Sequence, residues 1–126
     1  MTSISPNAPD WVESLCRVAS EYNSANLSIR DLFQRAAPNL EDQQLIEKVL
    51  SRLESEPALC TAWQQYSYDK RATPSPFLDG SRVGFAAVVE EEVVLRGVHT
   101  YETPMEACAH FIAREALWIL EGRELA

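Results

Sequence analysis

The amino-acid sequence predicts an α+β protein: about four N-terminal helices, then a β-hairpin and a long C-terminal helix, with a single layer of sheet packed on the helices. Three observations predict this fold. Apolar residues recur three and four positions apart over residues 8–68, which is typical of helices that bury one face. Residues 83–98 are instead rich in β-branched residues, which favour strands. The chain has 126 residues, 46% of them hydrophobic, so one domain can bury its own core.

The first two predicted helices have clear beginnings. Asn7, Pro9 and Asp10 supply a capping side chain, an early proline and an acid near the positive end of the helix dipole. The apolar face that follows is Trp11, Leu15, Val18, Ala19 and Tyr22. Ser28 can cap a second helix. We expect that helix to end before Pro38, because the residue preceding a proline avoids helical geometry.

Two further helices are predicted in the N-terminal half. Asn39 and Asp42 repeat the capping pattern before the third, and Pro57 restarts the chain as the fourth. The apolar positions of the third are Leu45, Ile46, Val49, Leu50 and Leu53. Those of the fourth are Leu59, Cys60, Trp63 and either Tyr66 or Tyr68. The helical part therefore occupies residues 8–68.

Residues 69–82 are predicted to form a loop. The segment contains two prolines, one glycine and no apolar period. A loop of this length is often functional or joins two layers of a fold. Lys70, Arg71 and Arg82 lie at its two ends, where arginines can fix a loop by binding carbonyl groups or nearby acids.

The hairpin–helix part is predicted over residues 83–122. Strands at 83–89 and 93–98 flank an acidic tip of Glu90, Glu91 and Glu92, whose turn type is left open because the tip lacks glycine and asparagine. The first strand is apolar on both faces toward its end, which predicts a sheet partly covered on both sides.

The C-terminal helix has the clearest local signal in the chain. Thr103, Pro104 and Glu106 form a capping box with proline at the first helical position, and Gly122 is placed to end the helix after about Glu121. Apolar residues cover most of its circumference, so we expect this helix to be central, packed on the hairpin and the N-terminal helices together. Its one polar stripe, spaced by four, is Glu106, His110 and Arg114.

The motifs of known catalytic and metal chemistry are absent from the sequence. It has two histidines and three cysteines but no C-x-x-C, H-x-x-x-H or H-E-x-x-H, so we expect no metal and no other cofactor. Cys16, Cys60 and Cys108 lie among apolar residues at helical spacing, which indicates buried free thiols in a reducing compartment. Phosphate-binding loops and a nucleophile elbow are also missing. No catalytic residue is therefore predicted.

The charge of the chain favours a protein partner. Nineteen acidic residues against eleven basic ones give a net charge of −8, which repels nucleic acid and attracts basic surfaces. The predicted partner-binding residues are Glu90, Glu91 and Glu92, then Glu41, Asp42, Glu54 and Glu56. The opening residues have neither a basic end nor an apolar stretch, and no run is long enough to span a membrane. We expect a cytoplasmic protein that binds neither membrane nor nucleic acid; the oligomeric state is not predicted.

The chain resembles the small cytoplasmic immunity proteins of bacterial polymorphic and contact-dependent toxin systems. The resemblance rests on its size, its acidity and residues 101–112 (YETPMEACAHFI), which match the Y-x-(S/T)-P-x-E-A style of opening of their terminal strand-then-helix unit. It implies an inhibitor of one cognate toxin, often a nuclease, with no enzymatic activity.

Two other functions fit the same sequence. A non-catalytic adaptor or regulatory protein-binding module would share the acidity without any toxin. A small hydrolase or transferase would use Glu106, His110 and Arg114 as a proton-handling group, although such a stripe is more often a satisfied polar face.

Overall fold

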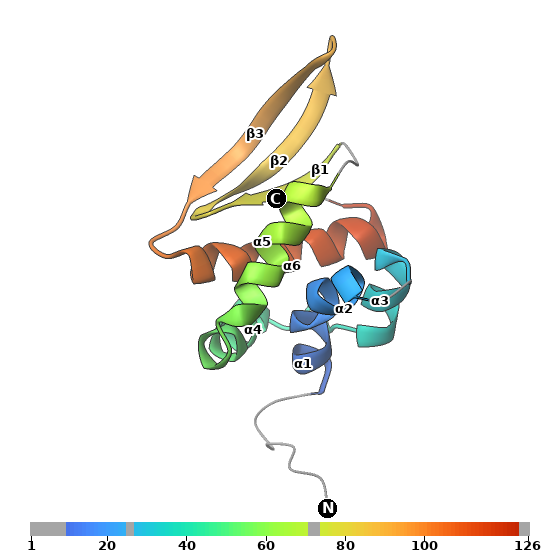
Figure 1. The fold of residues 1–126 in the computed structure, drawn as a ribbon, viewed down its shortest axis with the longest axis vertical. Helices are drawn as coiled ribbons and strands as arrows, with labels where there is room; N and C mark the ends of the chain where they lie inside the picture. Colours follow the sequence, from blue (N-terminus) through green and yellow to red (C-terminus); the bar gives the residue numbers. More distant parts are fainter. Residues whose placement is uncertain (1–9, 25–26, 71–73, 124–126) are drawn as a thin grey trace, which may run out of the picture.

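The computed structural model describes residues 10–24, 27–70 and 74–123, and it has the predicted α+β fold. Figure 1 shows the last helix running between the sheet and most of the N-terminal helices. The helices before the sheet are α1 (Asp10–Cys16), α2 (Val18–Ser24), α3 (Ile29–Ala36), α4 (Leu45–Ser55) and α5 (Ala58–Asp69). The sheet and the last helix are β1 (Ser75–Asp79), β2 (Arg82–Val89), β3 (Glu92–Thr100) and α6 (Pro104–Glu121).

The first predicted helix is divided at Arg17 into α1 and α2. Backbone hydrogen bonds from Arg17 N to Glu13 O (3.2 Å) and from Glu21 N to Arg17 O (2.9 Å) continue the helical pattern across the break. The predicted face is buried at Leu15, Val18 and Ala19, as expected, whereas Tyr22 is exposed. The predicted caps Asn7 and Pro9 lie outside the described residues.

The predicted capping sites differ in outcome. Ser28 caps α3 by accepting a hydrogen bond from Asp31 N (3.1 Å), as predicted. The third predicted helix begins later than expected, at Leu45. Asn39 and Asp42 accept hydrogen bonds from the backbone two residues on, so they shape turns before α4 and do not cap it.

The helix α6 is central, as predicted. Thr103 accepts a hydrogen bond from Glu106 N (3.1 Å), and Gly122 ends the helix at φ 67°. Its buried residues are Ala107, Cys108, Ala109, Phe111, Ile112, Ala113, Glu115, Ala116 and Leu117. Only one side of this helix can face the sheet, and the helix also contacts α3, α4 and α5.

An aromatic cluster joins these helices at the centre of the core. Trp63 of α5 is fully buried, and its ring centroid lies 6.0 Å from that of Phe111, 6.1 Å from Phe33 and 5.6 Å from Tyr66. The Trp63 indole nitrogen donates a hydrogen bond to the carbonyl oxygen of Cys16 (2.8 Å), so its polar atom is satisfied inside the core.

The prediction of a loop over residues 69–82 is wrong in its second half. Residues 75–79 form β1, which pairs antiparallel with β2 from Ser75↔Ala86 to Asp79↔Arg82. The sheet therefore has three strands in the order β1-β2-β3. Two prolines concealed the strand, and Pro76 is tolerated because β1 is an edge strand.

The outer edge of β1 is covered by polar side chains of α5. Ser67 Oγ accepts a hydrogen bond from Leu78 N (2.7 Å) and donates to Leu78 O (3.0 Å). Gln64 Nε2 also donates to Leu78 O (2.7 Å), and Lys70 Nζ donates to Pro76 O (2.9 Å). The backbone groups that would otherwise attract another strand are thus occupied from within the molecule.

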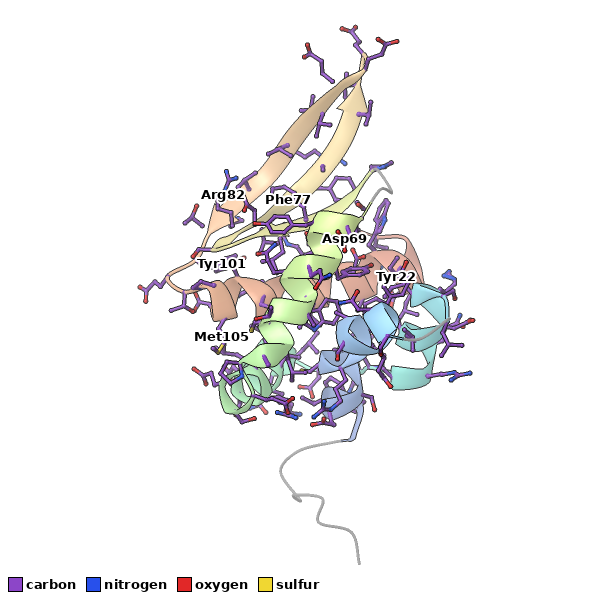
Figure 2. All side chains as sticks on the ribbon, viewed as in Figure 1. Tyr22, Asp69, Phe77, Arg82, Tyr101 and Met105 are labelled. Atoms are coloured by element: carbon purple, nitrogen blue, oxygen red, sulfur yellow. The ribbon has the colours of Figure 1, made fainter. Side chains whose placement is uncertain are left out.

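A β-bulge interrupts the pairing of β2 with β3. The register passes from Phe85↔Arg96 to Val83↔His99, so two residues of β3 stand opposite the single residue Gly84. Gly97 at this position has φ 60°. A Cβ on Gly84 would lie 2.8 Å from Phe77 Cε1, because the Phe77 side chain packs directly over the glycine (Figure 2 labels Phe77).

Candidate functional site

The outer part of the β2–β3 hairpin extends beyond the helices (Figure 1). We call residues 88–95 the arm; every one of them is exposed. Among them are five large aliphatic side chains: Val88 (53% exposed), Val89 (53%), Val93 (65%), Val94 (43%) and Leu95 (47%). The sequence predicted a sheet partly covered on both sides from the apolar end of its first strand. That end is exposed at Val88 and Val89, because α6 passes beneath only the inner part of the sheet.

The arm is apolar where a solvated hairpin would be polar. Burying one valine or leucine side chain contributes roughly 1.5–3 kcal/mol, so the arm leaves a large apolar contribution unused in the isolated chain. Adjacent exposed apolar side chains rimmed by charge are typical of protein-interaction sites.

The tip of the arm is a two-residue turn. Glu90 and Glu91 both have positive φ, 52° and 69°, as the central residues of a type I′ turn require. Glycine and asparagine adopt this conformation with little strain, whereas glutamate does so at a cost of about 1–2 kcal/mol per residue. With Glu92 beginning β3, three exposed carboxylates are gathered on this strained turn. Figure 2 shows side chains at this end of the hairpin standing clear of the rest of the molecule.

The other predicted binding acids do not join the tip. Glu41 is exposed in the turns before α4, and Glu54 is exposed near the end of α4. Asp42 forms an ion pair with Lys48, and its side chain is only 15% exposed. The hydrogen bond from Lys48 is the main cause that holds the pKa of Asp42 below its ordinary value, and the hydrogen bond from Gln44 N lowers the pKa further. Asp42 is therefore engaged in local structure and not displayed for a partner.

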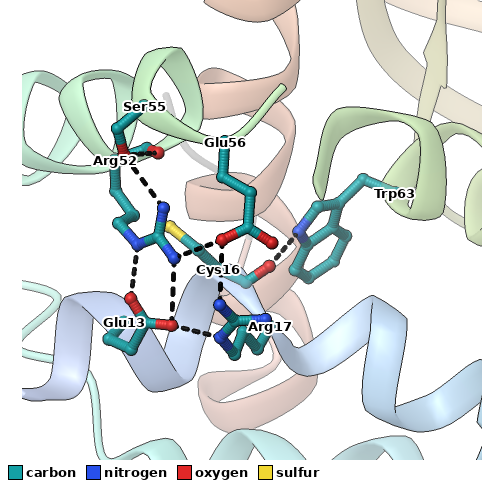
Figure 3. Close-up of polar contacts among 7 residues, drawn as sticks. All are labelled: Glu13, Cys16, Arg17, Arg52, Ser55, Glu56 and Trp63. Atoms are coloured by element: carbon teal, nitrogen blue, oxygen red, sulfur yellow. Dashed lines mark hydrogen bonds and ion pairs between the residues drawn. The ribbon is translucent and has the colours of Figure 1, made fainter. Parts of the chain in front are cut away.

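Glu56 also has partners inside the molecule. Its Oε1 accepts hydrogen bonds from Arg52 Nη2 (2.7 Å) and Arg17 Nη2 (2.9 Å), and Glu13 pairs with the same two arginines (Figure 3). The Arg52 hydrogen bond is the main cause that lowers the pKa of both glutamates. These four residues form an ion-pair cluster that ties α1 to the end of α4, so Glu56 has a structural role.

A buried polar cluster joins α5, α6 and β1. Glu115 is fully buried, accepts a hydrogen bond from Tyr66 and forms an ion pair with Lys70 Nζ (2.7 Å). Burial lowers the pKa of Lys70, and the Glu115 carboxylate opposes that shift. Burial also raises the pKa of Tyr66 well above its usual range. Sequence reasoning missed this cluster, because Lys70 was placed at one end of a predicted loop and Glu115 was hidden among apolar residues.

The polar stripe of α6 is engaged in local contacts. Glu106 Oε1 accepts a hydrogen bond from Glu102 N (3.4 Å) at the start of the helix. The imidazole of His110 stacks on the Tyr101 ring, with centroids 4.3 Å apart, and burial lowers its pKa. These contacts give Glu106 a capping role and His110 a packing role.

The remaining candidates for chemistry are less organised. Cys16 and Cys108 are buried and Cys60 is partly buried; burial raises the pKa of the Cys16 thiol to about 12. Within residues 10–24, 27–70 and 74–123, no three His, Cys, Asp or Glu side chains are grouped to hold a metal ion. A hollow of about 290 Å³ lies between α1, α2 and α3, lined by Ser14, Glu21, Ser24, Leu27, Leu32, Arg35 and Ala36. None of the helices in the described part of the chain is long and apolar enough to cross a membrane.

The arm is thus the feature of the described structure that is hardest to explain by stability alone. Its acids were predicted from the sequence; its exposed aliphatic residues were not, because an apolar strand is normally read as buried. Comparison of the chain with protein-family models, with curated proteins and with solved structures finds no match in any of the three.

Proposed function

We propose that this protein is a non-catalytic inhibitor that binds a cognate toxin domain, such as a nuclease, by placing the arm over the toxin's basic active-site cleft. The observation that carries the proposal is the arm itself: apolar strands that lead to three exposed carboxylates. A nuclease cleft is lined with cations that bind phosphate, and a carboxylate cluster on a narrow hairpin can occupy such a cleft.

The distribution of charge supports the same proposal. The net charge of −8 steers the protein toward basic surfaces and away from nucleic acid. Cations that were predicted near the 69–82 segment are engaged within the molecule: Lys70 with Glu115, and Arg82 Nη2 with Asp79 Oδ2 (2.7 Å). Arg71 lies outside the described residues. The tip acids have no such inward role to explain their position.

The experiment uses the product of the gene adjacent to this one as its probe. That product is expressed in cells with and without this protein, and binding of the purified pair is followed by surface plasmon resonance. We expect growth to be rescued by the wild type. The variant Glu90→Lys/Glu91→Lys should lose rescue and associate about tenfold more slowly at low salt.

A matched control separates the arm from general acidity. Glu41→Lys/Glu54→Lys changes the net charge by the same amount at exposed positions outside the arm. It should retain rescue and most of the association rate. Equal losses in the two variants would mean that the arm has no special role.

The adaptor function gives a different result in the same experiment. A neighbouring product that is neither toxic nor bound by this protein contradicts the toxin proposal. Weak binding to several unrelated basic proteins, lost in Glu90→Lys/Glu91→Lys, would instead support an adaptor that uses the same arm.

A further inference from the structure

The two outer edges of the sheet are not equivalent. The edge of β1 is covered by Gln64 and Ser67 of α5 and by Lys70, which follows α5, as described above. The strand β3 is the other edge, and among the described residues its strand partner is β2 alone. A row of backbone N–H and C=O groups along β3 therefore faces outward, where it can pair with another strand.

The usable part of this edge is short and regular. Residues 92–96 pair with β2 in continuous register, from Val89↔Glu92 to Phe85↔Arg96. The bulge at Gly97 then turns the strand out of that register. An added strand thus has five residues available, Glu92, Val93, Val94, Leu95 and Arg96.

These five residues are complementary to themselves. If a second copy of β3 lies antiparallel with Val94 opposite Val94, then Glu92 stands opposite Arg96 of the other copy, and this happens twice. Val93 stands opposite Leu95 in the same arrangement. Directly opposite residues in an antiparallel pair lie on one face, about 4.5–5.5 Å apart at Cβ, which suits an ion pair and an aliphatic contact.

Arg96 is anchored within its own hairpin. Its guanidinium lies over the Phe85 ring, with Cζ 4.7 Å from the ring centroid, and Phe85 itself is buried against Trp118. The cation is therefore held on a rigid part of the hairpin, on the same face of β3 as Glu92 and Val94.

We propose that two copies of this protein form a symmetric dimer by antiparallel pairing of their β3 edges over residues 92–96. The dimer joins the two sheets into one and covers part of each arm with the other. This inference shares Glu92 and the β3 part of the arm with the proposed function. Glu90 and Glu91 lie outside the paired residues, so their substitution tests the proposed function without removing a dimer contact.

The test measures molar mass by sedimentation velocity over a concentration series up to about 100 μM, where even weak dimers are populated. We expect the wild type to be a dimer at the upper end of the series. Glu92→Arg and Arg96→Glu each place like charges opposite each other, so each should weaken the dimer at least tenfold. The double variant Glu92→Arg/Arg96→Glu restores opposite charges and should recover the dimer.

Two controls keep the outcome interpretable. Glu90→Lys/Glu91→Lys lies outside the paired residues and should remain a dimer while it loses the basic partner. Arg96→Glu also removes the contact with Phe85, so its fold is checked by circular dichroism; if it fails to fold, Glu92→Arg alone decides. A wild type that stays monomeric throughout the series, or a dimer that Glu92→Arg leaves intact, overturns the proposal.

Discussion

At the scale of single residues, the strained tip is the most informative position. Glu90 and Glu91 hold a turn conformation that asparagine and glycine adopt more readily. They also place adjacent carboxylates beside Glu92. Both effects lower the stability of the fold. Residues that lower stability in this way are typical of binding sites.

Replacing the tip with a favourable turn should stabilise the protein. We expect Glu90→Asn/Glu91→Gly to raise the free energy of unfolding by up to about 2–4 kcal/mol, because backbone strain of about 1–2 kcal/mol is relieved at each of the two left-handed glutamates. Urea denaturation followed by circular dichroism measures the change. Glu90→Gln/Glu91→Gln removes the same charges but keeps the strained backbone, so it should gain clearly less. Equal gains would show that charge repulsion, not backbone strain, limits stability.

The buried ion pair makes a second prediction at this scale. Lys70→Met leaves the carboxylate of Glu115 buried without its cation, which should cost about 3 kcal/mol of unfolding free energy. Lys48→Met removes a lysine from the more exposed pair with Asp42 and should cost less. Thermal and urea denaturation of the two variants provide the comparison.

A double variant tests the cause of that loss. Lys70→Met/Glu115→Met removes both buried charges and should recover part of the stability, because no unpaired charge remains in the core. A double variant as unstable as Lys70→Met would instead assign the loss to the lysine's hydrogen bond with the Pro76 carbonyl and its packing on β1.

At the scale of secondary-structure elements, the ion-pair cluster should make the contact of α1 with α4 sensitive to acid. The pKa values of Glu13 and Glu56 are lowered from 4.5 in the folded protein, chiefly by Arg52. When the pKa of a carboxyl group is lower in the folded protein than in the unfolded chain, its contribution to stability is fully present at a pH above the unfolded-state pKa. That contribution is lost as the pH falls through the folded-state pKa.

The variant Arg52→Gln tests this pH dependence. It should be less stable than the wild type at pH 7, and the difference should shrink at about pH 3, because the two glutamates gain protons as the pH falls through their lowered pKa values. Urea denaturation at the two pH values measures it. Arg35→Gln removes an exposed arginine of α3 and should show a small difference that hardly changes with pH. A pH-independent deficit in Arg52→Gln would indicate lost packing and not lost ion pairs.

The elements that sequence reasoning found are those with local signals. The capping box at Thr103, the stop at Gly122 and the cap at Ser28 depend on residues close in the chain, and each is present. The strand β1 has no such local signal. Pro76 is compatible with β1 because β1 is an edge strand, and the Pro76 carbonyl oxygen accepts a hydrogen bond from Lys70. That arrangement depends on contacts that no local pattern contains.

At the scale of the whole molecule, composition predicted one core but not which apolar residues stay outside it. The valines of the arm have the same strand-forming pattern as Val83, which is fully buried. What separates them is the length of the hairpin relative to α6, a property of the assembled fold. The sequence shows which residues carry charge, so the acids of the tip could be predicted as candidates. It does not show which charges pair within the fold, so the partners of Asp42 and Glu56 were not predicted.

The unequal edges of the sheet also limit how large an assembly can grow. A polymer built by strand pairing needs every molecule to accept a strand on one side and offer one on the other. Here β1 is sealed by side chains of α5, and the bulge at Gly97 shortens the open run on β3. Each molecule can therefore take part in one such pairing, and the two-fold pairing of like edges uses it up. In the proposed dimer, pairing through this apolar hairpin would therefore stop at two copies and would not continue into an open-ended aggregate.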